Sequence, residues 1–207
     1  MAGIGMYGVY YSKCVIANGV VTGFSGLETM GKAISANFEP TTPDDNPLYA
    51  NNAIAETDTS SASGGTLTLT LDRLTQDAAA DLYGLTADTV QVTVGSDPGT
   101  EETGNRLKYT GLEQSSPVGV AFIRQNQEDG VRKHEVVIYR RVVFGMPTET
   151  AQTMGDSIEW QTPEIEGTVY GQEGDGTNAW YESVLFSTQA AAIQYITEYF
   201  QSSDVGG

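Results

Sequence analysis

The chain has 207 residues, of which 39% are hydrophobic and only 18% charged, with 24 glycines and 11 tyrosines. This composition is typical of one turn-rich β domain with its own core, and it excludes a disordered chain, which would hold fewer aromatic residues. The formal charge of −17 argues against a free duplex-binding protein, since such proteins bind phosphates through Lys and Arg, and is otherwise typical of a soluble acidic surface.

The N-terminal third predicts strands. Residues Tyr7–Ile16 are rich in aromatic and β-branched side chains and predict the first strand, followed by a turn at Asn18-Gly19 that leads into Val20–Thr22. Alternation over Lys32–Phe38 predicts a second strand, which Pro40 ends.

Residues 39–65 predict a long loop or hairpin arm. The segment is polar and rich in proline, and a loop of this length in a compact domain is usually functional or disordered. It also carries the apolar runs Leu48-Tyr49-Ala50 and Ala53-Ile54-Ala55, which indicate that it docks on a partner.

The next segments predict a strand, a helix and another strand. Unbroken alternation over Thr66–Leu71 places three leucines on one face and three threonines on the other. A short helix should begin after Thr75 and stop at Gly84. Its expected apolar face is Ala78, Ala79, Leu82 and Leu85. Val90–Val94 predicts the strand that follows.

The second half predicts a turn-rich insertion over Gly95–Asn105 and then further strands. Val118–Arg124 and Glu135–Phe144 should be strands joined at Asp129-Gly130, and the second should be central because Val136–Tyr139 is apolar on both faces. Late strands are expected at Ser157–Gln161 and Ile165–Tyr170, with Pro163 at an edge or bulge, and a C-terminal helix at 187–201. We expect one domain over residues 1–207.

No motif predicts catalysis, a metal or a cofactor. Gly3–Gly8 has the GxGxxG spelling, but no strand precedes it and no helix follows, so a flexible N-terminal arm is the better interpretation. His134 lacks partners for a triad or a zinc site and is expected to start a strand. The acidic loop Glu173–Asn178 departs from the calcium-loop pattern and predicts an ordinary turn.

The remaining single residues also have simple interpretations. Cys14 is the lone cysteine, so an intrachain disulfide is excluded and a small buried side chain in a reducing cytoplasm is expected. Trp160 and Trp180 are expected to anchor a core or an interface. No apolar run approaches the ~20 residues of a membrane span, and no secretory signal is expected.

Three stretches together resemble one known family. They are Lys32–Pro40 followed by Leu48–Asn52, then Gly64–Leu69, and finally Val142–Pro147 leading to Gly155–Thr168. In this order and spacing they resemble the major tail protein, or tail tube protein, of siphophages and related prophages. The resemblance covers roughly residues 1–170, and Pro163–Thr168 with its upstream strand is its most specific part.

The resemblance implies a tail-tube-type β-sandwich with a flanking helix. Hexameric rings would stack around a tape-measure protein, one sheet of each subunit would line the channel, and DNA would pass without specific binding. Tail terminator and distal tail proteins would be further partners, and the protein would assemble in the host bacterial cytoplasm and lie in the virion tail. The arm would bridge rings, with contact candidates at Pro47, Leu48, Tyr49, Asn51, Asn52 and Ile54. The channel-lining residues are not predicted.

Two other functions compete with this hypothesis. The first is a β-sandwich binding module, immunoglobulin-like or carbohydrate-binding, on a virion or cell surface, which should show a compact aromatic patch. The second is a hydrolase on a β scaffold, which would need an acid, base or nucleophile set that the sequence does not single out. We therefore expect a structural protein that is not an enzyme.

Overall fold

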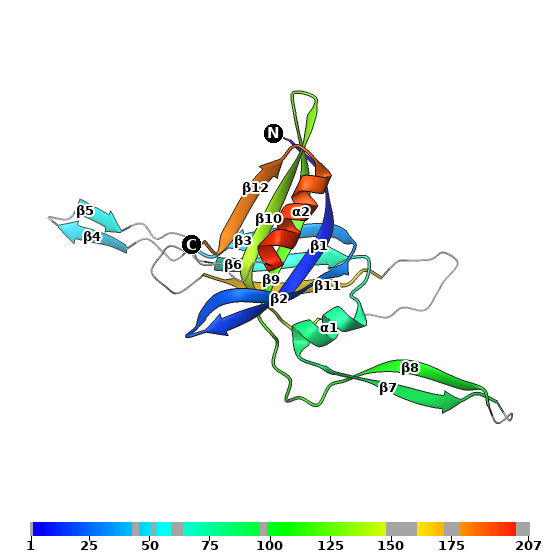
Figure 1. Cartoon of the computed structure of the whole chain (residues 1–207). Helices are drawn as coiled ribbons and strands as arrows, with labels where there is room; N and C mark the ends of the chain where they lie inside the picture. Colours follow the sequence, from blue (N-terminus) through cyan, green and yellow to red (C-terminus); the bar gives the residue numbers. More distant parts are fainter. Residues whose placement is uncertain are drawn as a thin grey trace, which may run out of the picture.

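The computed structural model describes residues 2–42, 46–50, 53–58, 64–95, 99–147, 161–171 and 179–201. The protein is mainly β in these ranges (Figure 1). Its elements are β1 (Ala2–Ala17), β2 (Val20–Gly31), β3 (Ala33–Pro40), β4 (Asn46–Ala50), β5 (Ala53–Asp58), β6 (Gly64–Leu71), α1 (Gln76–Tyr83), β7 (Thr86–Thr93), β8 (Glu101–Lys108), β9 (Val118–Glu128), β10 (Val131–Phe144), β11 (Glu164–Tyr170), β12 (Tyr181–Phe186) and α2 (Gln189–Gln201).

One antiparallel sheet forms the body, in the order β2-β1-β9-β10-β11-β6-β3. Strand β10 changes partner along its length: His134–Tyr139 pair with β12, whereas Val142–Phe144 pair with β11. A register shift against β9 between Tyr139 and Val142 marks the change, as expected where a strand passes from one layer to another. The sheet therefore folds into a sandwich.

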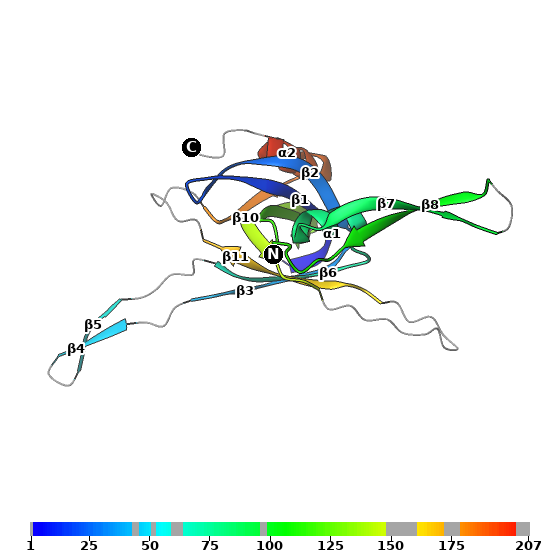
Figure 2. The same cartoon turned by 90° about the horizontal axis from the view of Figure 1, so that it is seen from below.

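The core lies between the two layers. The leucines of β6 alternate with threonines, and Leu67, Leu69 and Leu71 are fully buried as predicted. They belong to one cluster with Tyr11 of β1 and Val137 of β10, and with α1. Figure 2 shows the β3–β6–β11 layer on one side of the body and β1, β2 and α2 on the other.

Helix α2 covers the opposite face of β9 and β10 (Figure 1). The sequence predicts this helix from the spacing of Ile193, Ile196 and Phe200. Ile196 and Phe200 are buried with Ala192 and pack on strand residues such as Ile123 and Ile138, whereas Ile193 is only partly buried. The predicted C-terminal helix is confirmed, although it begins two residues later than expected.

Replacement of Ile196 by Ala should lower the free energy of unfolding by about 2–5 kcal/mol, because it opens a cavity at a fully buried site. Urea unfolding followed by circular dichroism measures this. The exposed Gln194 on the same helix supplies the control, since Gln194→Ala should change stability by less than about 0.5 kcal/mol. Equal effects of the two substitutions would contradict the packing of α2.

Helix α1 has the predicted capping residues. The side chain of Thr75 accepts a hydrogen bond from the Ala78 backbone N–H, and Gly84 ends the helix with a φ of 66° in the left-handed region. Ala78, Ala79 and Leu82 are buried against the core. The predicted turns Asn18-Gly19 and Asp129-Gly130 are also confirmed, since all four residues have positive φ, as type I′ hairpin turns require.

Several predictions were wrong. Residues Gly3–Gly8 are not a flexible arm, because they extend β1 and pair with β9 from Ala2↔Gln127 onward. The insertion Gly95–Asn105 contains most of a strand, β8, and β2 continues far beyond Thr22. In β3, a register shift between Ala33 and Ser35 breaks the expected alternation and leaves Ile34 exposed.

Some predictions cannot be compared with the structure. Trp160, the loop Glu173–Asn178 and all but the last residue of the strand expected at Ser157–Gln161 lie outside the described residues, and Gln161 itself is not in a strand. Pro163 directly precedes β11, where its carbonyl accepts a hydrogen bond from the Leu71 N–H at 3.1 Å.

Candidate assembly surfaces

The predicted arm is a hairpin that continues the β3–β6 pair. Pro40 lies opposite Gly65, and the Thr41 N–H donates to the Gly64 carbonyl at 3.0 Å, which closes the base of the arm. Farther out, β4 and β5 pair antiparallel with each other as a two-stranded sheet. Figures 1 and 2 show this hairpin standing clear of the body. Because an isolated two-stranded hairpin is marginally stable in water, a partner surface would stabilise it.

Four of the six contact candidates lie on the two strands of this hairpin. Pro47, Leu48 and Tyr49 belong to β4, and Ile54 of β5 lies opposite Tyr49 in the register. Asn51 and Asn52 lie outside the described residues.

The outward side chains of the β3–β6–β11 layer form a second surface, here called the polar face. It comprises Ser35, Asn37, Glu39, Thr66, Thr68, Thr70, Glu164, Glu166, Thr168 and Tyr170. The register aligns them in cross-strand rows, such as Asn37–Thr68–Glu166. The hydroxyls of Ser35 and Thr70 bond at 2.9 Å. The face therefore presents hydroxyl, amide and carboxylate groups, and contains no Lys or Arg.

Strand β11 explains why this sheet has one polar and one apolar side. Ile165 and Val169 face the core, while Glu164, Glu166 and Thr168 are exposed. Gly167 also faces inward, where an added Cβ would lie 2.7 Å from Val142 Cγ1 and 2.8 Å from Phe144 Cδ1. The Glu-Ile-Glu-Gly-Thr stretch is thus the pattern of a strand with a closely packed inner side and an acidic outer side.

A cation borders the polar face on β10. The guanidinium of Arg141 lies 5.3 Å from the ring centroid of Tyr170, and its Nη1 donates to the Gly19 carbonyl at 3.2 Å. This arginine is held by a ring and a carbonyl, so its position is set by the protein.

The sheet has open edges. Within the described residues β2 and β3 end the strand order, and β12 pairs with β10 alone. An edge strand leaves N–H and C=O groups that can pair with another chain. These edges are therefore candidates for contacts between subunits.

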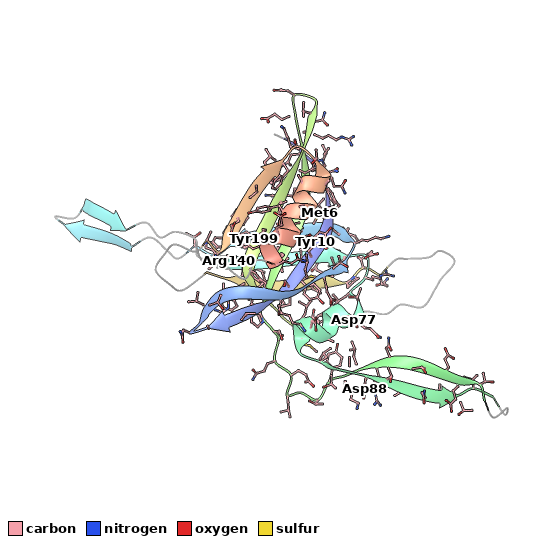
Figure 3. All side chains as sticks on the ribbon, viewed as in Figure 1. Met6, Tyr10, Asp77, Asp88, Arg140 and Tyr199 are labelled. Carbon is pink, nitrogen blue, oxygen red and sulfur yellow. The ribbon has the colours of Figure 1, made fainter. Side chains whose placement is uncertain are left out.

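A second hairpin, β7–β8, projects from the end of the body that holds α1 (Figure 1). Asp88 accepts hydrogen bonds from Arg106 Nε and Nη2, both at 2.7 Å, and Lys108 Nζ lies 2.8 Å from it. Hydrogen bonds from Arg106, which contributes most, and from Lys108 hold the pKa of Asp88 well below its usual range. Figure 3 shows Asp88 on this hairpin and Asp77 on the neighbouring α1. The sequence missed this hairpin, since β8 has little apolar alternation.

The titratable residues near His134 form a structural network. His134 lies within β10, and its Nδ1 is 2.9 Å from the Tyr7 hydroxyl. Burial opposes ionisation of Glu135, but hydrogen bonds from Ser183 and Asn126 and the charge of Arg124 together hold its pKa below the usual range. This network ties β10 to β9 and β12.

Cys14 and Trp180 behave largely as interpreted. Cys14 is half-buried in β1 with its Sγ 3.3 Å from the Arg140 carbonyl, and burial raises the pKa of its thiol to about 12 against the opposing charges of Arg141 and Arg140. Trp180 packs on the core beside Phe38 and Tyr181.

Comparison with known proteins assigns no family. No protein-family model matches the chain, and no curated protein sequence matches it. In the part of the chain that the structure describes, no group of three or more His, Cys, Asp or Glu could hold a metal ion. Among the same residues, neither helix is long and apolar enough to cross a membrane.

Proposed function

We propose that this chain is a major tail protein that self-assembles into stacked hexameric rings, and that these rings form the tail tube through which phage DNA passes during infection. The observation that carries the proposal is the polar face. A sheet surface of hydroxyls and carboxylates without Lys or Arg attracts water and repels phosphate. As a channel wall it lets DNA slide, because adhesion to DNA requires neutralised phosphates.

The edges and the arm support the same proposal. In a ring, the contact between neighbours is heterologous, so each subunit offers two different surfaces. The open edges of β2, β3 and β12 can supply such surfaces. Pairing between neighbouring subunits would then cover these edges in the finished ring. The β4–β5 hairpin projects from the end of β3 and β6, the layer that carries the polar face. Because it extends beyond the body, it can contact a subunit of the next ring in the stack.

The proposal defines the partners and the location. The first partner is the chain itself, in rings and in the tube. Others are the tape-measure protein inside the tube, the tail terminator and distal tail proteins at its ends, and DNA passing without specific binding. The protein is assembled in the bacterial cytoplasm and lies in the virion tail. It requires no cofactor and performs a structural, not an enzymatic, role.

Negative-stain microscopy of the purified chain tests this function. We expect rings or tubes of constant diameter, formed over a range of protein concentrations and at ~0.15 M salt, where long-range repulsion between acidic subunits is largely screened. Monomers alone, across salt and concentration, would contradict the proposal. A monomer that binds glycans would support the binding-module alternative instead.

A further inference from the structure

A large groove lies at the end of the body that holds α1. It has a volume of about 1180 Å³ and runs between α1, the base of the β7–β8 hairpin and the start of β11. Its apolar lining includes Leu74, Ala79, Leu107, Tyr109 and Met146. Three residues of the polar face, Glu164, Glu166 and Thr168, also line it, so the two surfaces adjoin along β11. Pockets for small molecules usually measure ~300–1000 Å³. This groove exceeds that range, and its size suits a segment of polypeptide.

One residue that lines the groove has a buried polar group without a partner among the described residues. Tyr83, the last residue of α1, is 1% exposed and lines the groove, yet its hydroxyl has no hydrogen-bond partner among the described residues. Burial, with a smaller contribution from nearby Tyr109, raises the pKa of this phenol to about 12. The hydroxyl is therefore protonated and can donate a hydrogen bond. A buried donor of this kind costs free energy until it finds an acceptor.

The groove and the β4–β5 hairpin lie at opposite ends of the same strands. The hairpin joins β3 to β6 and therefore leaves the layer at Pro40 and Gly64. Strand β6 then runs away from the hairpin to Leu71, and the residues that follow, 72–74, line the groove. A head-to-tail stack of copies thus brings the hairpin end of one copy against the groove end of the next.

We infer that this groove is the docking site for the β4–β5 hairpin of a second copy of the chain. The inference rests on the proposed function, because it names the receiving surface for the arm. Residues 42–63 allow a hairpin to reach up to about 36 Å, at ~3.3 Å per residue over half of the segment. Its sequence supplies Leu48, Tyr49 and Ile54 for the apolar lining, and its main-chain carbonyls supply acceptors for Tyr83.

This contact has the symmetry of a stack. The hairpin and the groove are different surfaces, so the contact between them is heterologous, and a heterologous contact repeated by translation extends without closing. Each copy would use its hairpin towards one ring and its groove towards the other. The contact therefore propagates along the tube axis and is distinct from the contacts within a ring.

Disulfide trapping between separate chains tests this docking. In a Cys14→Ser background, one preparation carries Leu48→Cys and a second, size-tagged preparation carries Tyr109→Cys in the groove. Mixed, assembled and oxidised, they should give a hybrid dimer on a non-reducing gel. The matched control is Leu112→Cys, which is 87% exposed and does not line the groove. It should give at least tenfold less hybrid dimer.

The outcomes separate this inference from the proposed function. Tubes that form without the Leu48–Tyr109 cross-link, or with equal cross-linking to Leu112→Cys, overturn the docking and leave the tube function standing. Absence of any assembly overturns both. Residues 148–160 of the same chain are the rival occupant. If they fill the groove, a chain that carries both Met154→Cys and Tyr109→Cys should form an internal cross-link in monomers as well as in tubes. The Leu48→Cys and Tyr109→Cys chains should then give no hybrid dimer, and this result overturns the docking.

The Tyr83→Phe variant gives an independent readout. Because the hydroxyl has no partner among the described residues of the isolated chain, its removal should leave the melting temperature of the monomer unchanged or raise it. The critical concentration for tube assembly should rise about fivefold, since the donor to the docked hairpin is lost. A lower melting temperature with unchanged assembly would overturn the assignment of Tyr83.

Discussion

Deletion of residues 43–62 should leave a folded sandwich that forms rings but no tubes. Strands β3 and β6 are neighbours in the sheet, and the Thr41 N–H already bonds the Gly64 carbonyl at the base of the arm. After the deletion, Thr42 and Ser63 form a two-residue connection, and changing them to Asn and Gly suits a type I′ turn. The sandwich should keep its core, since the residues of its two described core clusters come from elements outside the deleted segment.

Microscopy and thermal unfolding measure the two halves of this prediction. The melting temperature should stay within a few degrees of that of the full chain, while tubes longer than a few rings should be lost. The matched control shortens the other projecting hairpin by replacing residues 94–100 with Asn-Gly, which removes the tip beyond β7 and β8 but leaves the groove at their base. This control should still form tubes. Tubes of normal length from the arm-deleted chain would show that the arm does not join rings.

The sequence predicted those elements whose local chemistry and tertiary environment agree. The strand of alternating leucines and threonines, the helix from Thr75 to Gly84 and the Asp129-Gly130 hairpin were all predicted, because alternation, capping and positive φ are local requirements. The centrality of β10 also followed from its sequence. Val136–Tyr139 is buried on both faces, with α2 on one side and the core on the other.

The missed elements are those that depend on pairing with distant residues. Strand β8 is almost wholly exposed and holds two adjacent glutamates, so nothing in its sequence resembles a half-buried strand. Register with β7 and the Asp88–Arg106 ion pair define it instead. Residues 2–8 are rich in glycine, which predicted an arm, yet pairing with β9 makes them a strand. Short-range patterns do not contain these partners.

The candidate surfaces also divide into one that the local sequence predicts and others that depend on contacts between distant residues. The arm was found from its length and its apolar residues, but the groove depends on α1, β8 and β11, which meet only in the fold. The polar face was also beyond the sequence, since its rows join residues as distant as Asn37, Thr68 and Glu166. The acidic residues are too numerous for the sequence to single these out.

Charge reversal on the polar face should turn a sliding surface into an adhesive one. The variant Glu164→Lys/Glu166→Lys places two cations on adjacent exposed positions of the same side of β11. Both positions face away from the core, so folding should persist. Both also line the groove, so negative-stain microscopy first checks that this variant forms tubes. Inside a tube, each ring would then present a band of lysines that binds phosphate and releases counterions. We expect tubes of this variant to retain duplex DNA that resists nuclease.

The matched control is Glu128→Lys/Glu198→Lys, which makes the same change of net charge at exposed positions of β9 and α2. If the polar face lines the channel, DNA bound by the control lies outside the tube and is digested, whereas DNA bound by the polar-face variant is protected. Retention by the latter should fall about 10³-fold or more between ~50 and ~200 mM salt, as expected for six or more phosphate contacts. Equal nuclease sensitivity of the two variants would place the polar face on the outside of the tube. The two variants add the same four units of charge, in one case to β11 of the polar face and in the other to β9 and α2.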